Sequence, residues 1–195
     1  MGESTRRSRI LEVAARLVIH YGPAKTTVTD IAREAGVSVG AVYLEFPSKE
    51  QIVLALAESR YDRVLHALRQ ALSGPDPLEC RIRRAFDVRL EVFLGACDEG
   101  THGNDLIACE SSPVRTAERR YLEEEHALFE ANIREAAGAG EIWAPDPTLT
   151  TRALLRCYAT FRPPALRSCD REGLAECMGE VHRLVARGLL ERRTG

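Results

Sequence analysis

Cysteine and histidine side chains in the middle of the chain are the first candidates for chemistry. Cys97, His102, Cys109 and Glu110 bring sulfur, nitrogen and oxygen donors close together in the sequence. Such donors can bind zinc or copper, and an accessible thiol can respond to oxidants. Their spacing matches no CxxC or zinc-finger pattern, so we expect no metal site and no cofactor. A thiol- or metal-sensing role for Cys97 and Cys109 stays open as an alternative.

An enzyme that uses a cysteine–histidine pair is a second alternative. Cys97, His102, Cys109 and His126 contain a possible nucleophile and a possible base. The sequence has no nucleophile motif around them, no glycine-rich phosphate loop and no paired acid–base signature. We therefore expect that the protein is not an enzyme.

The segment TVTDIAREAGVSVGAVYLEF, residues 27–46, has the layout of a helix-turn-helix motif. Thr27 suits the N-cap of one short helix, with Asp30 completing a variant of the capping box. Gly36 can take the left-handed conformation that ends this helix, and Ser38 caps the next one. The second helix, at about residues 39–44, can project into a DNA major groove about 12 Å wide. Small and apolar residues allow the two helices to cross closely: Ile31, Ala32, Ala35, Val37, Val42 and Phe46.

From Ile10 to about Leu56 the sequence resembles the N-terminal domain of TetR-type (tetracycline-repressor-like) transcriptional regulators. The resemblance rests on TTV, DIA, AGVS, a Tyr followed three residues later by Phe, and the SKE junction. It implies a ligand-responsive, DNA-binding regulator of transcription. The most common form is a repressor that a small-molecule effector releases from its operator.

Carried over residue by residue, the resemblance implies that Thr27, Tyr43 and Lys49 contact DNA phosphates. A hydroxyl at a helix N-terminus, a rigid phenol and a flexible ammonium are each suited to bind phosphate. The resemblance also implies that the tip of the recognition helix meets the bases, at Ser38, Val39, Gly40 and Ala41.

The expected recognition helix lacks the side chains that usually read bases. No Arg, Lys, Asn or Gln lies at residues 39–44. We expect Val39 and Ala41 to contact thymine methyl groups, with DNA shape adding selectivity. Glu45 either accepts from a cytosine amino group or stays solvated. An arginine near the start of the chain is a candidate for a minor groove: Arg6, Arg7 or Arg9.

Helical periodicity along the chain predicts an all-α fold. Breakers and caps place helices at about 5–21, 27–36, 39–44, 48–72, 77–97, 105–110, 113–138, 147–161 and 171–190. We expect a three-helix DNA-binding domain at residues 1–48. Residues 49–195 would then form a helical domain for effector binding and dimerisation.

Composition excludes several other classes of protein. A chain of 195 residues with 45% hydrophobic residues can build a core, and its net charge of -2 excludes a non-specific nucleic-acid binder. Positive charge is local, since residues 1–49 hold seven basic and five acidic residues. No segment has the apolar length of a membrane span, and the N-terminus lacks a secretory signal. We expect a cytoplasmic protein with no membrane contact.

One DNA-binding domain contacts few phosphates, so useful affinity for DNA requires two of them on a pseudo-palindromic, double-stranded operator. We therefore expect a homodimer. The last two helices carry apolar stripes suited to its interface, and the resemblance implies the same region. One stripe holds Leu149, Leu154, Tyr158 and Phe161, and the other holds Leu174, Cys177, Met178, Val181, Leu184, Val185 and Leu189.

The small-molecule effector needs a pocket inside the body. Side chains of suitable size on predicted inward faces are Phe93, Cys97, Cys109, His126, Phe129 and Tyr158. For each of them the alternative role is core packing, because apolar stripes at helical spacing normally build a core.

Overall fold

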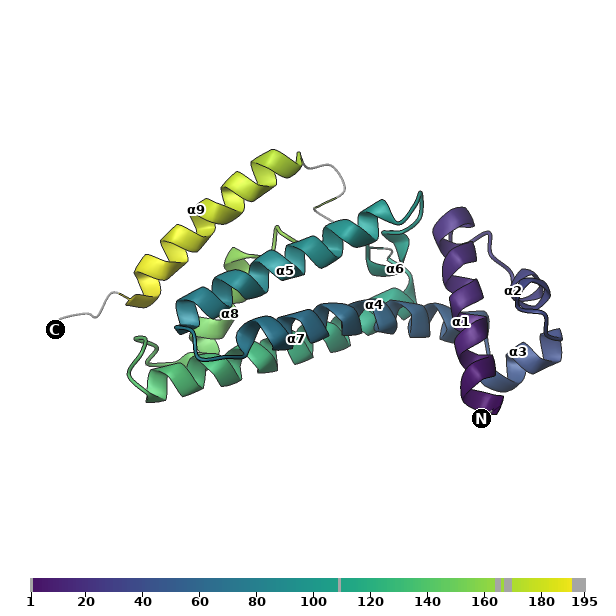
Figure 1. Cartoon of the computed structure of the whole chain (residues 1–195), viewed down its shortest axis with the longest axis horizontal. Coiled ribbons are helices and arrows are strands. Elements are labelled where there is room, and N and C mark those ends of the chain that lie inside the picture. Colours follow the sequence, from purple (N-terminus) through teal and green to yellow (C-terminus); the bar gives the residue numbers. More distant parts are fainter. Residues whose placement is uncertain (1, 109, 164–165, 167–169, 191–195) are drawn as a thin grey trace. The chain divides into compact units, whose positions relative to one another are not determined.

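The computed structural model describes residues 2–108, 110–163, 166 and 170–190, and every regular element within them is an α-helix (Figure 1). This confirms the predicted all-α fold. None of the described helices combines the length and the apolar character needed to cross a membrane. The elements are α1 (Gly2–Tyr21), α2 (Val28–Ala35), α3 (Val39–Glu45), α4 (Lys49–Leu72), α5 (Leu78–Asp98), α6 (Asp105–Ala108), α7 (Ser112–Gly138), α8 (Pro147–Cys157) and α9 (Arg171–Leu190).

The chain forms two compact units. The first consists of Met1–Asp62 with Gly95–Arg120, and the second of Arg63–Leu94 with Tyr121–Gly195. Three helices, α4, α5 and α7, therefore contribute residues to both units. The predicted functional division after residue 48 stays a prediction, since compactness alone does not test it.

In the first unit, α1, α2 and α3 form the helix-turn-helix head. Ile10 and Ala14 of α1 and Ala35 of α2 are completely buried, and α2 contacts both α1 and α3. Gly36 ends α2 with a φ of 66°, the left-handed conformation that favours glycine. Val42 is the buried residue of α3, whereas Val39, Tyr43 and Leu44 of this short helix are exposed.

A loop after α5 holds the C-terminal end of α1 within the same unit. The His102 backbone N–H donates to the Ile19 carbonyl at 3.0 Å, and the Asp105 carboxylate accepts from His102 Nδ1 at 2.7 Å. A Cβ on Gly22 would lie 3.1 Å from the His102 ring, so glycine allows this close approach. Two further contacts position the loop: Arg60 pairs with Glu99, and the Tyr61 hydroxyl donates to the Ile107 carbonyl at 3.0 Å.

The core of the second unit combines an aromatic stack with a buried ion pair. The Phe86 ring stacks on Tyr158 with 3.6 Å between centroids and on Phe129 with 4.9 Å. Arg89 and Glu125 are 1% and 2% exposed and bond to each other at 2.8 Å. Buried charges need such partners, because removing them from water is costly.

The end of α8 differs from the prediction. We expected this helix to reach about Phe161, whereas it ends at Cys157. The Tyr158 carbonyl accepts from Arg89 Nη2 at 2.8 Å, and the following residues form tighter turns onto Arg156 and Tyr158. A carbonyl bound to a buried guanidinium fixes the chain direction here, so the helix does not continue.

Candidate DNA interface and effector pocket

Thr27 and Ser38 begin the two helices of the motif as predicted. The Thr27 hydroxyl accepts from the Asp30 backbone N–H at 3.1 Å and donates to its carboxylate at 2.5 Å. This hydroxyl hydrogen bond is the main reason that the pKa of Asp30 lies below its ordinary value. Ser38 Oγ accepts from the Ala41 N–H at 3.1 Å. The Thr27 hydroxyl already donates its proton to Asp30, so it could donate to a phosphate only if this hydrogen bond broke.

Tyr43 and Lys49 lie at accessible positions of the same unit. The Tyr43 side chain is 49% exposed, so its phenol is not a core aromatic. The Lys49 ammonium donates to the Ala24 carbonyl at 3.3 Å, which brings it to the turn before Thr27. The structure thus brings Lys49 to the turn that leads to Thr27, another of the predicted phosphate contacts.

The tip of the recognition helix is open to solvent. Ser38 and Gly40 are exposed, Val39 is 38% exposed and Ala41 is half-buried. Leu44, one turn further on, is 80% exposed. This outward face is therefore apolar apart from hydroxyl groups.

Glu45 takes neither of the two roles that the sequence left open. Its carboxylate accepts from Arg6 Nε at 2.7 Å and lies 2.5 Å from Arg6 Nη2, with 11% of the side chain exposed. The Arg7 guanidinium lies 4.6 Å from the centre of the Phe46 ring. Both arginines therefore hold the end of α3 to α1, which occupies them in the free protein.

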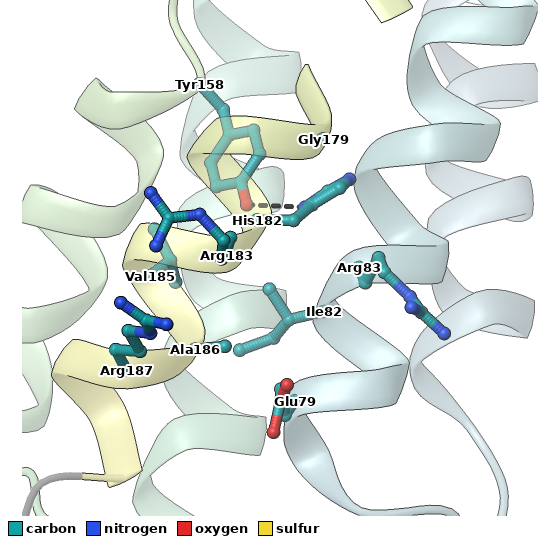
Figure 2. Close-up of a pocket in the computed structure, with 10 residues that line it drawn as sticks. All are labelled: Glu79, Ile82, Arg83, Tyr158, Gly179, His182, Arg183, Val185, Ala186 and Arg187. Carbon is teal, nitrogen blue, oxygen red and sulfur yellow. Dashed lines mark hydrogen bonds between the residues drawn. The ribbon is translucent and has the colours of Figure 1, made fainter. Parts of the chain in front are cut away.

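A pocket of about 410 Å³ lies between α5 and α9 of the second unit (Figure 2). Apolar side chains from both helices form its walls: Ile82, Val185 and Ala186. Charged side chains stand around them: Glu79, Arg83, Arg183 and Arg187. This volume lies within the range of small-molecule sites, about 300–1,000 Å³.

A relay, by which we mean a chain of hydrogen bonds between three side chains, lies at one end of the pocket. Figure 2 shows the Tyr158 hydroxyl facing His182, and the Oη to Nδ1 distance is 2.6 Å. His182 Nε2 lies 3.0 Å from Asp87 Oδ1 on α5. Burial raises the pKa of Tyr158 well above its ordinary value, so the phenol stays protonated and donates to His182. The relay therefore joins α5, the end of α8 and α9.

The predicted effector residues lie in different places. Tyr158 lines the pocket. Phe129 does not line it, but stacks on Phe86, which in turn stacks on Tyr158. Phe93 packs edge-on against Tyr121, and His126 pairs with Glu130 at 3.5 Å. Cys97 belongs to the other unit, and Cys109 lies outside the described residues. The effector roles of these residues stay predictions.

Several polar residues of the second unit were not predicted from the sequence to take part in a site. His182, Asp87, Arg89 and Glu125 form buried or pocket-lining bonds between helices. The sequence held one indication of such residues, namely a polar residue on an otherwise apolar helix face. Arg89 is an example, because it lies between Phe86 and Phe93 at helical spacing. Its partner could not be identified in this way, since Glu125 lies elsewhere in the sequence.

Metal binding finds no support in the part of the chain that the structure describes. No group of three or more His, Cys, Asp or Glu side chains there is arranged to hold an ion. His102 of the predicted cluster pairs with Asp105, and Cys97 is half-buried. The thiol-sensing alternative stays a prediction.

The head matches a family model. Residues 10–56 match the model described as "Bacterial regulatory proteins, tetR family". The HTH-type transcriptional regulator TtgR of Pseudomonas putida is 38% identical over 189 residues, which cover 94% of this chain and 89% of the relative. The HTH-type transcriptional repressor KstR2 of Mycobacterium tuberculosis is 38% identical over 91 residues, covering 46% of this chain and 45% of the relative.

Solved structures share the fold along nearly the whole chain. A transcriptional regulator of the TetR/AcrR family from Thermobifida fusca has a TM-score of 0.71 and 26% identity, covering 97% of this chain and all of that one. A TetR transcription regulator from Haloarcula marismortui has a TM-score of 0.68 and 20% identity, covering 96% of this chain and 100% of that one. The resemblance inferred from the sequence is thus confirmed. The chain belongs to the TetR family and is a helix-turn-helix transcriptional regulator, of a kind that is typically a ligand-responsive repressor.

Proposed function

We propose that this protein is a dimeric repressor that binds a pseudo-palindromic operator through α3 and leaves it when a small molecule binds. The observation that carries the proposal is the open tip of α3, held on capped helices beside Tyr43 and Lys49. The similarity to a named repressor over the head supports repression rather than activation. We also place the protein in the cytoplasm, where its DNA target would lie.

Phosphate contacts by Tyr43 and Lys49 make a direct test of DNA binding possible. A duplex selected by the wild-type protein from a random library serves as the probe. Lys49→Ala should weaken binding and reduce the slope of log affinity against log salt by about one unit. Arg119→Ala, which removes an exposed positive charge from α7, is the control and should leave the slope unchanged. An unchanged slope for Lys49→Ala would contradict the assigned contact.

An apolar surface on α8, α9 and the segment before α8 supports dimerisation with a second copy of this chain. Trp143, Leu149 and Leu184 are 46%, 57% and 56% exposed, although they are large and apolar. A shallow pocket of about 330 Å³ beside them is lined by Ala153, Cys157, Val185 and other residues. Large exposed apolar patches usually mark an interface.

The predicted interface stripes are only partly available for a partner. Leu154, Tyr158 and Phe161 are buried within the chain's own core, as are Leu174 and Met178. Leu149, Cys177 and Leu184 face outward and remain candidates. The proposed dimer face is therefore narrower than the sequence pattern indicated.

We place the effector in the pocket between α5 and α9. Its apolar walls suit a compact, largely apolar molecule, and the Tyr158–His182 end offers a hydrogen-bonding partner for one polar group. A ligand that competes for Tyr158 or His182 would change the bonds that connect α9 to α5 and α8. A change in α9 would alter the proposed dimer face and hence the spacing of the two heads.

Helix α5 offers a covalent route from the pocket to the head. Its residues Glu79, Ile82 and Arg83 line the pocket, and its last residues belong to the first unit. The loop that follows contacts Ile19 and Gly22 at the end of α1 through His102. A ligand that prefers one position of α5 would shift the population of head positions by its difference in affinity.

Filling the pocket tests the effector site. A compound library is first screened for molecules that release the wild-type protein from the selected duplex. Ala186→Trp should occupy the pocket, keep DNA affinity and lose the response to these compounds. Glu172→Trp, at the start of the same helix, should respond like the wild type. Full release of Ala186→Trp by the same compounds would exclude this pocket.

A further inference from the structure

The face that α3 turns to solvent contains almost no hydrogen-bonding side chain. The helix consists of Val39, Gly40, Ala41, Val42, Tyr43, Leu44 and Glu45. Val42 is buried, and the side chains that remain accessible are mainly Val39, Tyr43 and Leu44. Ser38 before the helix already accepts the Ala41 N–H. An apolar surface is therefore what this helix can offer to the edge of a base.

The one charged residue of α3 is neutralised inside the protein. Arg6 lies 2.5–2.7 Å from the Glu45 carboxylate, which is 11% exposed. Arg7 covers the neighbouring Phe46 ring. This pairing keeps a carboxylate that would repel DNA phosphates away from the groove, and it leaves Leu44 as the outermost side chain at this end of the helix.

An apolar side chain can recognise one feature of the major groove. Every base pair presents donors and acceptors there, but among the four unmodified bases the thymine C5-methyl is the one apolar group. Guanine and adenine are usually read by bidentate donors and acceptors, which α3 lacks. Building on the proposed DNA-binding function, we propose that α3 reads A·T pairs through thymine methyl groups, with Leu44 as the principal contact and Val39 as a second one.

Leu44 makes an informative test position because it does not stabilise the fold. Its side chain is 80% exposed, so Leu44→Ala removes little buried area and should unfold at the wild-type temperature. Any change in DNA binding by this variant then reports on a contact to DNA. Lys49→Ala is the matched control, because a phosphate contact carries no information on base identity.

The experiment compares thymine with uracil, which differs from it by this methyl group. The probe is the duplex selected by the wild-type protein, with uracil replacing thymine at one position of each half-site in turn. At a contacted position the wild type should bind the uracil duplex about fourfold more weakly per methyl lost, as expected for one buried carbon. Leu44→Ala should bind both duplexes equally at the position that Leu44 contacts. Lys49→Ala should weaken both while keeping their ratio.

Two results would overturn the inference. One is wild-type binding that is indifferent to uracil at every position, and the other is a Leu44→Ala variant that keeps the full thymine preference everywhere. A protein that selects a duplex but ignores uracil contradicts the methyl readout and leaves the proposed regulator standing. A protein that selects no duplex contradicts both.

Discussion

Two of the ion pairs that involve a glutamate of α7, Arg89–Glu125 and Arg69–Glu124, show how much the surroundings of a residue decide its contribution to stability. Arg89 and Glu125 are almost fully buried at 2.8 Å, whereas Arg69 and Glu124 form a pair of equal length that is about half exposed. Water screens the exposed pair, and its contribution to stability is small. Breaking the buried pair leaves a charge without water or partner.

We therefore predict that Arg89→Met lowers the free energy of unfolding by about 3–5 kcal/mol. The Glu125 carboxylate would lose its guanidinium partner, and the Tyr158 carbonyl would lose a donor at the end of α8. The control Arg69→Met should change the free energy of unfolding by about 1 kcal/mol or less. Urea unfolding followed by circular dichroism measures both, and equal losses in the two variants would contradict the role of burial.

Asp30 gives a prediction of pH dependence. The Thr27 hydroxyl bond lowers its pKa below the ordinary 3.8, so the ionised carboxylate stabilises the folded head. This stabilisation is fully present above pH 3.8 and is lost as the pH falls through the lower folded pKa. The melting temperature of Asp30→Asn should therefore lie below that of the wild type at neutral pH, with the gap narrowing in stronger acid. A gap that stays constant down to acidic pH would argue against this bond.

At the scale of helices, caps made by neighbouring residues could be predicted, whereas the end of α8 could not. Thr27, Ser38 and Asp146 each bond to a backbone N–H three residues later, so local sequence is enough to place these caps. The end of α8 depends on Arg89, which lies 69 residues away from Tyr158 in the sequence. Periodicity continues past Cys157, and nothing local indicates that a distant guanidinium stops the helix.

The same limit applies to the candidate site. The tip of α3 could be predicted because a motif of consecutive residues carries it. The Arg6–Glu45 pair could not, since its members lie 39 residues apart and both are ordinary surface types. The pocket between α5 and α9 likewise depends on how two distant helices pack, which no single helix pattern specifies.

The loop after α5 leads to a prediction about signalling. His102→Ala removes the ring that lies against Gly22 and the bond to Asp105. DNA affinity without effector should stay close to that of the wild type, whereas effector-induced release should fall severalfold, within the usual coupling range of about 5–150-fold. Fluorescence anisotropy with a labelled duplex measures both quantities. The control His66→Ala, an exposed position on α4, should keep the full response, and a normal response of His102→Ala would exclude the loop from the signal path.

At the scale of the whole molecule, two groups of exposed apolar side chains have different proposed partners. Leu44 belongs to the head and faces DNA in our proposal, whereas Leu184 belongs to α9 and faces a second copy of the chain. If the protein binds DNA through two heads, the apolar side chains around Leu184 must be buried in a dimer interface before both heads can contact DNA. Oligomeric state and DNA binding should therefore change together.

We predict that Leu184→Glu produces a monomer, because a buried, unpaired carboxylate opposes association. Sedimentation velocity should show a dimer for the wild type and a monomer for this variant. Leu44→Glu, which places the same charge at an exposed leucine of the head, should remain a dimer. A dimeric Leu184→Glu variant would move the interface away from this face.

The most direct test of the whole account is a hydroxyl-radical footprint of the wild-type protein on its selected duplex. Two heads should protect two backbone tracts whose centres lie about 34 Å, or one helical turn, apart or a multiple of it. The two tracts should disappear together in the Leu184→Glu variant. A single protected tract for the wild type, or protection that is unchanged in the monomeric variant, would contradict recognition by a pair of α3 helices.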